Sequence, residues 1–232
     1  MKKHPWKLLL GSTALAAASV VQAEPPTRLF VQETGEVSKE MSIDLDYNLG
    51  PSSSGLAGGL RIGAFGGEVL LNSKTDLSLD GSGFDGSNIG YKAMVMPNLA
   101  AYGILSHEKV EGFPSTTNFA IGASYTMRID RLMLNGNVEY VTDDQGFNGR
   151  GDESTLFLKG GVGYLIPSNY GRFTAIGELV LEDNDFLDTV VNLGLRWEPR
   201  KNISVDFVLV NERGDNGSMN GLPGAVRLNI VF

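Results

Sequence analysis

Apolar and polar residues alternate with a repeat of two along most of the chain. The clearest stretches place apolar side chains at Met41, Ile43, Leu45 and Tyr47; at Phe119, Ile121, Ala123, Tyr125 and Met127; at Leu156, Leu158, Val162, Tyr164 and Ile166; and at Ile203, Val205, Phe207 and Leu209. Almost no segment carries apolar residues at the helical spacing i, i+3, i+4 and i+7. Alternation of this kind is typical of strands with one apolar face. The sequence therefore predicts an all-β chain of antiparallel hairpins.

The connections between these segments are of two kinds, and the two kinds alternate along the chain. The tight ones are "PN" at Pro97, "DR" at Asp130, "PSNYG" from Pro167 and "EPRKN" from Glu198. The longer, mostly acidic ones begin at Leu49, Asp80, Glu111, Asp143, Glu182 and Asn211. In a closed barrel this order places all short turns at one rim and all long loops at the other.

Counting with that alternation gives an even number of strands. We expect them at Met41–Tyr47, Gly58–Phe65, Glu68–Leu79, Ile89–Met96, Leu99–Lys109, Asn118–Ile129, Arg131–Val141, Thr155–Ile166, Arg172–Leu181, Thr189–Trp197, Ile203–Val210 and Ala225–Phe232. The glycine-rich run "RIGAFGGEVLL" can be one bent strand or two strands, and we divide it at Gly66–Gly67. The prediction is a closed antiparallel transmembrane β-barrel of about 12 strands, with 10 as the alternative.

The first residues of the chain have a different composition. Residues 1–23 combine Lys2, Lys3 and Lys7 with an apolar stretch and end on Ala23, as secretory signal peptides do. The apolar stretch is interrupted at Gly11–Thr13 and is too short to span a membrane as a helix. We therefore predict a signal peptide at 1–23, an N-terminal periplasmic segment at 24–37 and the barrel at 38–232.

Composition excludes several classes of function. The chain has no cysteine, which excludes disulfides and thiolate metal sites. Its formal net charge of -8 and its lack of a basic stripe argue against nucleic acid as a partner. The acidic loops do not have the spacing of a calcium-binding loop, so the sequence predicts no defined metal site and no cofactor. Whether these loops bind divalent ions or host receptors is left open.

The chain ends in "GAVRLNIVF", with Val226, Leu228, Ile230 and Phe232 on one face of the last strand and Arg227 and Asn229 on the other. Together with the signal peptide and the alternating strands, this ending resembles the porin-like outer-membrane β-barrel proteins of Gram-negative bacteria. The resemblance implies a place in the cell outer membrane, contact with lipid and lipopolysaccharide, and assembly by the barrel-assembly machinery, which reads a terminal aromatic such as Phe232. A secreted β-sandwich is the alternative, although it would not need a terminal aromatic.

Function should reside in the side chains of the other face, which point into the barrel. Seven acids and seven bases are expected there as pore-lining residues: Asp44, Asp46, Glu68, Asp76, Glu139, Glu178 and Asp206, with Arg61, Lys74, Lys92, Arg128, Lys159, Arg196 and Arg227. Opposite charges on neighbouring strands would fill the lumen, whereas charges segregated to opposite walls would leave a wet pore. Small inward residues, among them Gly63, Gly122, Gly161 and Gly194, would leave room for one.

We favour a narrow porin-like channel for small polar solutes. The alternative is a closed barrel with a structural or adhesin-like role, suggested by Arg-Gly-Asp at Arg150–Asp152 and Arg213–Asp215. A remote alternative is a barrel lipid hydrolase. It is disfavoured because Ser106 and His107 are adjacent in a strand and point to opposite faces, so the sequence predicts no enzyme and no catalytic residue. The identity of the solute and the oligomeric state are left open.

Overall fold

The computed structural model describes residues 28–30, 32–49, 54–76, 84–110, 115–143, 153–183, 189–213 and 224–232. All regular elements in these ranges are strands: β1 (Met41–Leu49), β2 (Ser54–Ala64), β3 (Gly67–Asp76), β4 (Phe84–Met96), β5 (Leu99–Val110), β6 (Thr116–Ile129), β7 (Leu132–Asp143), β8 (Glu153–Ile166), β9 (Arg172–Glu182), β10 (Val190–Arg200), β11 (Ile203–Arg213) and β12 (Gly224–Val231). Among the described residues, no helix has the length and apolar character needed to cross a membrane.

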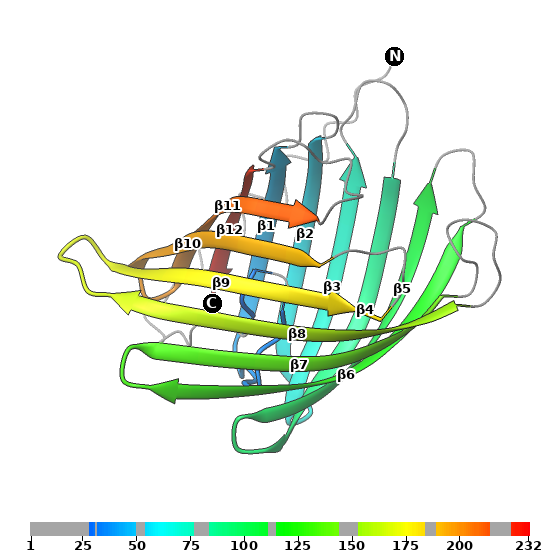
Figure 1. Cartoon of the computed structure of the whole chain (residues 1–232), viewed down its shortest axis with the longest axis horizontal. Coiled ribbons are helices and arrows are strands. Elements are labelled where there is room, and N and C mark those ends of the chain that lie inside the picture. Colours follow the sequence, from blue (N-terminus) through cyan, green and yellow to red (C-terminus); the bar gives the residue numbers. More distant parts are fainter. Residues whose placement is uncertain are drawn as a thin grey trace.

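The strands form one closed barrel in which each strand pairs antiparallel with its neighbours in sequence, and β12 pairs with β1 (Figure 1). The prediction of 12 strands is confirmed, and the alternative of 10 is wrong. The glycine-rich run divides as expected, because Phe65 and Gly66 both adopt positive φ, 54° and 77°. Positive φ at both central residues is the geometry of the tight hairpin turn that matches strand twist. Phe65 therefore lies in the turn and not at the end of the preceding strand.

Strand ends differ from the prediction where the sequence lacks apolar contrast. β2 begins at Ser54 and β4 at Phe84, several residues earlier than predicted, because small and polar residues there still pair with the neighbouring strand. β10 continues through Pro199 to Arg200, and the turn lies at 201–202. The pairing with β11 shifts register between Trp197 and Arg200. Such an irregularity accommodates a proline inside a sheet.

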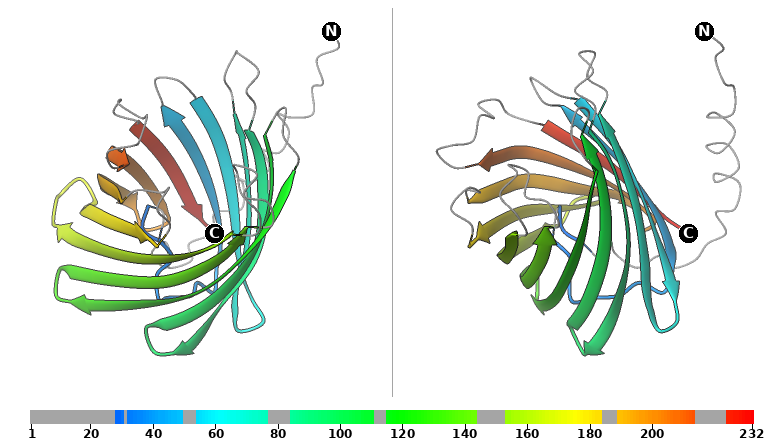
Figure 2. Two further views of the ribbon diagram at one scale, coloured as in Figure 1. Left: turned by 45° about the vertical axis from the view of Figure 1, so that its right-hand side comes forward. Right: turned by 90° about the vertical axis from the view of Figure 1, so that its right-hand side faces the viewer.

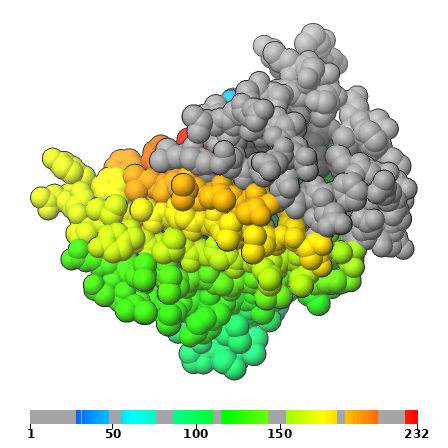
Figure 3. Space-filling view, viewed as in Figure 1, coloured from blue at the N-terminus to red at the C-terminus, as the bar shows by residue number. Residues whose placement is uncertain are grey.

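The outer face of the barrel is apolar and the inner face is polar. Leu45, Ile121 and Leu158 are about half exposed on the outside. Figure 3 shows the side chains of β6 to β9 as one continuous wall. At the end with the short turns, the rings of Phe173 and Trp197 stack with centroids 6.2 Å apart. An apolar band with aromatic residues near its edge is what a membrane-embedded barrel requires.

The interior of the barrel is occupied by the chain itself. The described residues between 28 and 40, which we call the lumenal segment, lie inside the ring of strands (blue in Figure 2). Leu29 and Phe30 are almost fully buried and form a small apolar core with Met133 and Ile176. The core of this molecule therefore lies between its N-terminal segment and the inner wall.

Candidate functional site

The lumenal segment is a compact turn followed by an extended stretch that leads into β1. Arg28 and Glu33 form an antiparallel bridge, and the Leu29 amide donates to the Gln32 carbonyl at 2.9 Å. We expected a periplasmic segment at 24–37. Its described residues instead lie within the barrel, because wall side chains bond to both its backbone and its carboxylate.

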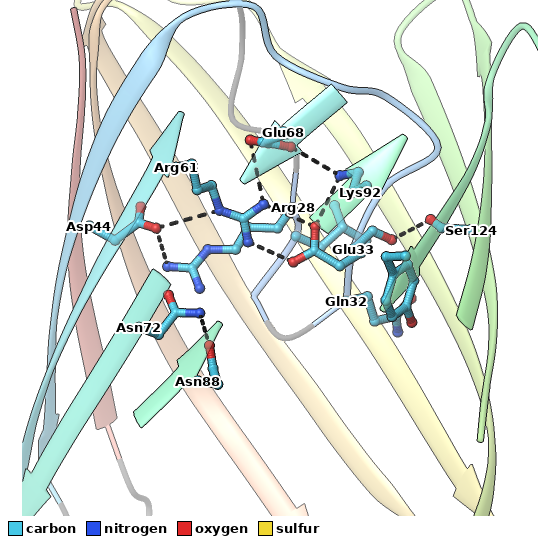
Figure 4. Close-up of polar contacts among 12 residues, drawn as sticks. Arg28, Gln32, Glu33, Asp44, Arg61, Glu68, Asn72, Asn88, Lys92 and Ser124 are labelled. Carbon is cyan, nitrogen blue, oxygen red and sulfur yellow. Dashed lines mark hydrogen bonds and ion pairs between the residues drawn. The ribbon is translucent and has the colours of Figure 1, made fainter. Parts of the chain in front are cut away.

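Glu33 makes the first anchor of the segment to the wall (Figure 4). Its carboxylate accepts two hydrogen bonds from the Arg61 guanidinium of β2, at 2.6 and 2.9 Å, and one from Lys92 Nζ of β4 at 3.0 Å. Burial would raise the pKa of Glu33, but Arg61 and Lys92 outweigh it and hold this pKa well below its usual range. Glu33 is therefore ionised and fixed between two cations.

The second anchor comes from β9, β10 and β12 and contacts the backbone. The Glu178 carboxylate accepts from the amides of Phe30 at 3.0 Å and Gln32 at 3.2 Å. Arg196 donates to the carbonyls of residues 28 and 29, and Arg227 to those of residues 29 and 30. Charged groups that satisfy buried backbone make stronger hydrogen bonds than neutral ones do.

The third anchor is made by polar side chains of β6 and β7. The Ser124 hydroxyl donates to the Glu33 carbonyl at 2.6 Å, and the Asn135 amide donates to the same oxygen at 3.0 Å. The Gly35 amide donates to the Thr126 hydroxyl at 2.8 Å. All three of these wall residues are buried. The segment is thus held on three sides of the lumen.

Glycines of the wall receive the apolar side chains of the segment. A Cβ placed on Gly161 would lie 2.4 Å from Leu29 Cδ1, and one on Gly194 would lie 2.7 Å from the Phe30 ring. A Cβ on Gly122 would meet the Tyr102 ring at 2.4 Å. We expected such glycines to leave open space for a channel. At these positions the space is filled by side chains.

The charged residues predicted to line the lumen pair mainly between neighbouring strands. The wall pairs are Asp46 with Arg227, Asp206 with Arg196 at 2.7 Å, Glu139 with Lys159 at 2.6 Å, Glu68 with Lys92 at 3.6 Å, and Glu68 with Arg61 at 3.7 Å. Asp44 pairs with Arg28 of the segment at 2.8 Å, Arg128 with Glu36 at 2.7 Å, and Lys74 with Glu108 at 3.0 Å. Asp76 is the last residue of β3, opposite Gly55.

Sequence reasoning missed several members of this network. Arg28, Glu33 and Glu36 precede the first strand, so strand parity assigns them no direction. In the sequence Tyr102 resembles the other apolar strand residues, but in the structure its hydroxyl donates to Glu139 at 2.7 Å. The sequence feature that could have indicated a buried segment is the apolar run "LFV" just before a polar stretch. It stands in a part of the chain predicted to lie outside the barrel.

Two cavities flank the lumenal segment. One of about 220 Å³ opens toward the long-loop end and is lined by Asn72, Lys74, Asn88 and Glu108 among others. The other, of about 130 Å³, lies at the short-turn end beside the β6–β7 turn. Arg28 borders both cavities. The lumenal segment therefore lies between two hollow regions of the lumen.

His107, the histidine considered for catalysis, lies on β5 near the long-loop end. It is exposed, and its Nδ1 is 3.2 Å from the Thr117 hydroxyl. Ser106 lines the cavity at that end, on the opposite face of the strand. The signal peptide at 1–23, Arg150–Asp152 and Gly214–Asp215 lie outside the described residues, so these predictions remain predictions.

This fold, a closed antiparallel barrel of 12 strands with an apolar outer face and a charged lumen, is similar to that of two solved porins. The porin NanC is similar in structure, with a TM-score of 0.52 and 14% sequence identity over 83% of this chain and 98% of that one. The porin KdgM, in complex with disordered oligogalacturonate, is similar with a TM-score of 0.56 and 13% identity over 82% of this chain and 98% of that one. No protein-family model and no curated protein matches the sequence. At these identities the likeness establishes the fold.

Proposed function

We propose that this chain is an outer-membrane channel for small polar solutes, and that the structure represents its closed state. The observation that carries the proposal is the pair of cavities at opposite ends of the lumen, separated by the lumenal segment. Both cavities have charged side chains in their walls, and the one at the long-loop end has amide side chains as well. A polar lining of this kind can solvate small polar solutes in place of water.

The outer face supports a place in the outer membrane. Its exposed apolar side chains, such as Leu45, Ile121 and Leu158, alternate along the strands with inward residues that are mostly polar, as lipid contact on one side and water on the other require. The partners we infer are therefore outer-membrane lipid and lipopolysaccharide, with no nucleic acid. Recovery of the folded protein with the outer-membrane fraction tests this location, and recovery as a freely released secreted protein would contradict it.

Conductance tests the channel. We would record the mature protein in planar bilayers beside Glu33→Gln, which removes the charge from the anchor between Arg61 and Lys92, and Glu36→Gln as a matched control. Glu36 pairs with the half-exposed Arg128, so solvent screens this pair more than it screens the pairs of Glu33. We expect stepwise openings in Glu33→Gln at least about tenfold more often than in wild type, equivalent to about 1.4 kcal/mol. Glu36→Gln should raise the opening frequency less than Glu33→Gln does.

The second candidate is a closed barrel with a structural or surface-interaction role. Ion pairs between neighbouring strands favour it, because charges paired along the wall also fill a lumen. The same recordings separate the two candidates. Absence of stepwise current at every voltage, in wild type and in Glu33→Gln alike, would contradict the channel and favour the closed barrel.

A further inference from the structure

We infer that the inner wall carries a peptide-binding site, that residues 28–36 are its resident ligand, and that this ligand is a displaceable plug. This inference rests on the proposed channel and adds how the channel is regulated. Three observations support it. The wall bonds to the backbone of the segment, the charges of the wall stay paired without the segment, and the sheet closes without it.

About half of the hydrogen bonds between wall and segment go to the peptide backbone. Wall side chains bond to the amides of Phe30, Gln32 and Gly35. They also bond to the carbonyls of residues 28, 29, 30 and 33. Charged or polar groups from β6, β7, β9, β10 and β12 take part. A wall that bonds to successive donors and acceptors of a backbone in this way can recognise peptide.

Two positions of the segment add selectivity for its sequence. Phe30 fills the space above Gly194. Glu33 lies between Arg61 and Lys92 and bonds to both (Figure 4). An aromatic and a carboxylate three residues apart are thus matched by an open space and a cationic pair. The site distinguishes this peptide from others by one apolar and one ionic contact.

The wall remains balanced in charge when the segment is removed. Arg61 lies 3.8 Å from Asp44 and 3.7 Å from Glu68, and Lys92 lies 3.6 Å from Glu68. On the other side Arg196 pairs with Asp206, and Arg227 pairs with Asp46. Departure of Glu33 therefore leaves both bases beside carboxylates of the wall. This lowers the cost of leaving a buried charge unpaired.

The sheet is also complete without the segment. The barrel closes through pairing of β1 with β12 and β2, with no strand contributed by the described residues between 28 and 36. These residues are attached to the wall by its side chains, and Glu40, at the entry to β1, accepts from the Gly63 amide at 3.1 Å. Residues 28–36 can consequently leave the lumen while the barrel stays closed and the chain stays hinged near β1.

A reversible crosslink tests the plug in the full mature chain. Leu29→Cys with Gly161→Cys places two thiols where a Cβ on Gly161 meets the Leu29 side chain, in a protein that has no other cysteine. We expect no stepwise current after oxidation and openings at wild-type frequency or above after reduction. Leu29→Cys with Gly160→Cys is the matched control, because Gly160 is exposed, and its current should not respond to oxidation.

A second measurement follows the segment itself. In the folded single variant Leu29→Cys we expect slow labelling by a water-soluble maleimide, accelerated at least about tenfold by adding Glu33→Gln. Stepwise current that is equal before and after reduction of the crosslink would overturn the plug and leave the channel standing. Accelerated labelling without current in any variant would support the displaceable segment and contradict the channel. Labelling that does not respond to Glu33→Gln would overturn the plug.

Discussion

At the scale of single residues, Glu33 organises the closed state. It connects the segment to Arg61 and Lys92 through its carboxylate and to Ser124 and Asn135 through its carbonyl. Glu33 therefore connects β2 and β4 on one side of the barrel with β6 and β7 on another. Removing one partner of a buried ion pair costs about 3–5 kcal/mol in other proteins. The bases here keep Glu68 as a neighbour, so we expect a smaller loss.

The pH dependence of closure follows from the same contacts. The pKa of Glu33 is held below its ordinary value of 4.5, so its contribution to closure is present above that value and is lost only as pH falls through the lower, folded-state pKa. We expect the open probability of the wild-type channel to change little between pH 7 and about pH 4. A rise in opening centred near 4.5 that is missing in Glu33→Gln would contradict the anchor.

Glycines of the wall offer a packing test. Gly161→Val would force the Leu29 side chain or the new one to move, and overpacking of this kind costs about 1–3 kcal/mol. Gly136→Val is the control, because a Cβ there meets nothing within 4 Å and the residue is exposed. We expect urea unfolding of the folded barrel to show a lower free energy for Gly161→Val alone. Equal effects of the two substitutions would mean that Leu29 does not occupy this space.

At the scale of elements, β12 closes the barrel, and the chain is held up to its last residue. The Val231 amide donates to the Asn202 carbonyl at 2.9 Å, and the Phe232 amide donates to the Met41 carbonyl at 2.8 Å. The end of the chain is therefore bonded on both sides, and Phe232 lies at the rim with the short turns. This is the place that the alternation of "GAVRLNIVF" predicts for a terminal aromatic.

Deleting Phe232 should impair assembly more than secretion. We propose that the terminal aromatic is read by the assembly machinery, so the truncated chain should be exported but accumulate unfolded outside the membrane. The measurement is the fraction of heat-modifiable, folded protein in the outer membrane, with Phe232→Tyr as the control that keeps an aromatic. Normal surface levels of the truncated chain would refute the assignment.

Most of the fold could be predicted from sequence because each strand separates an apolar face from a polar one. That contrast locates all twelve strands and assigns direction to residues such as Asp44 and Arg227. It weakens at strand ends, where Ser54 and Phe84 begin strands that alternation does not mark. It also says nothing of what fills the lumen. Arg28 and Glu33 lie outside the strands, so alternation does not predict which way their side chains point. Only the folded, closed barrel brings them to the wall.

At the scale of the whole molecule, the charged residues of the lumen have two roles. Acids and bases pair along the wall, and the same wall binds the lumenal segment through Glu33, Gln32 and the backbone. A barrel of 12 strands lies between small barrels, which side chains fill, and wide porins, which stay open. In this chain a peptide supplies the filling that the wall side chains alone do not.

The central claim is that residues 28–36 occupy the lumen of the folded barrel, and amide hydrogen exchange tests it most directly. The amides of Phe30, Gln32 and Gly35 are bonded to Glu178 and Thr126 inside the barrel. In the folded mature protein we predict that they exchange at least about a hundredfold more slowly than in a free peptide of the same sequence. Exchange at the rate of the free peptide would show that the segment lies outside the barrel and would contradict the account.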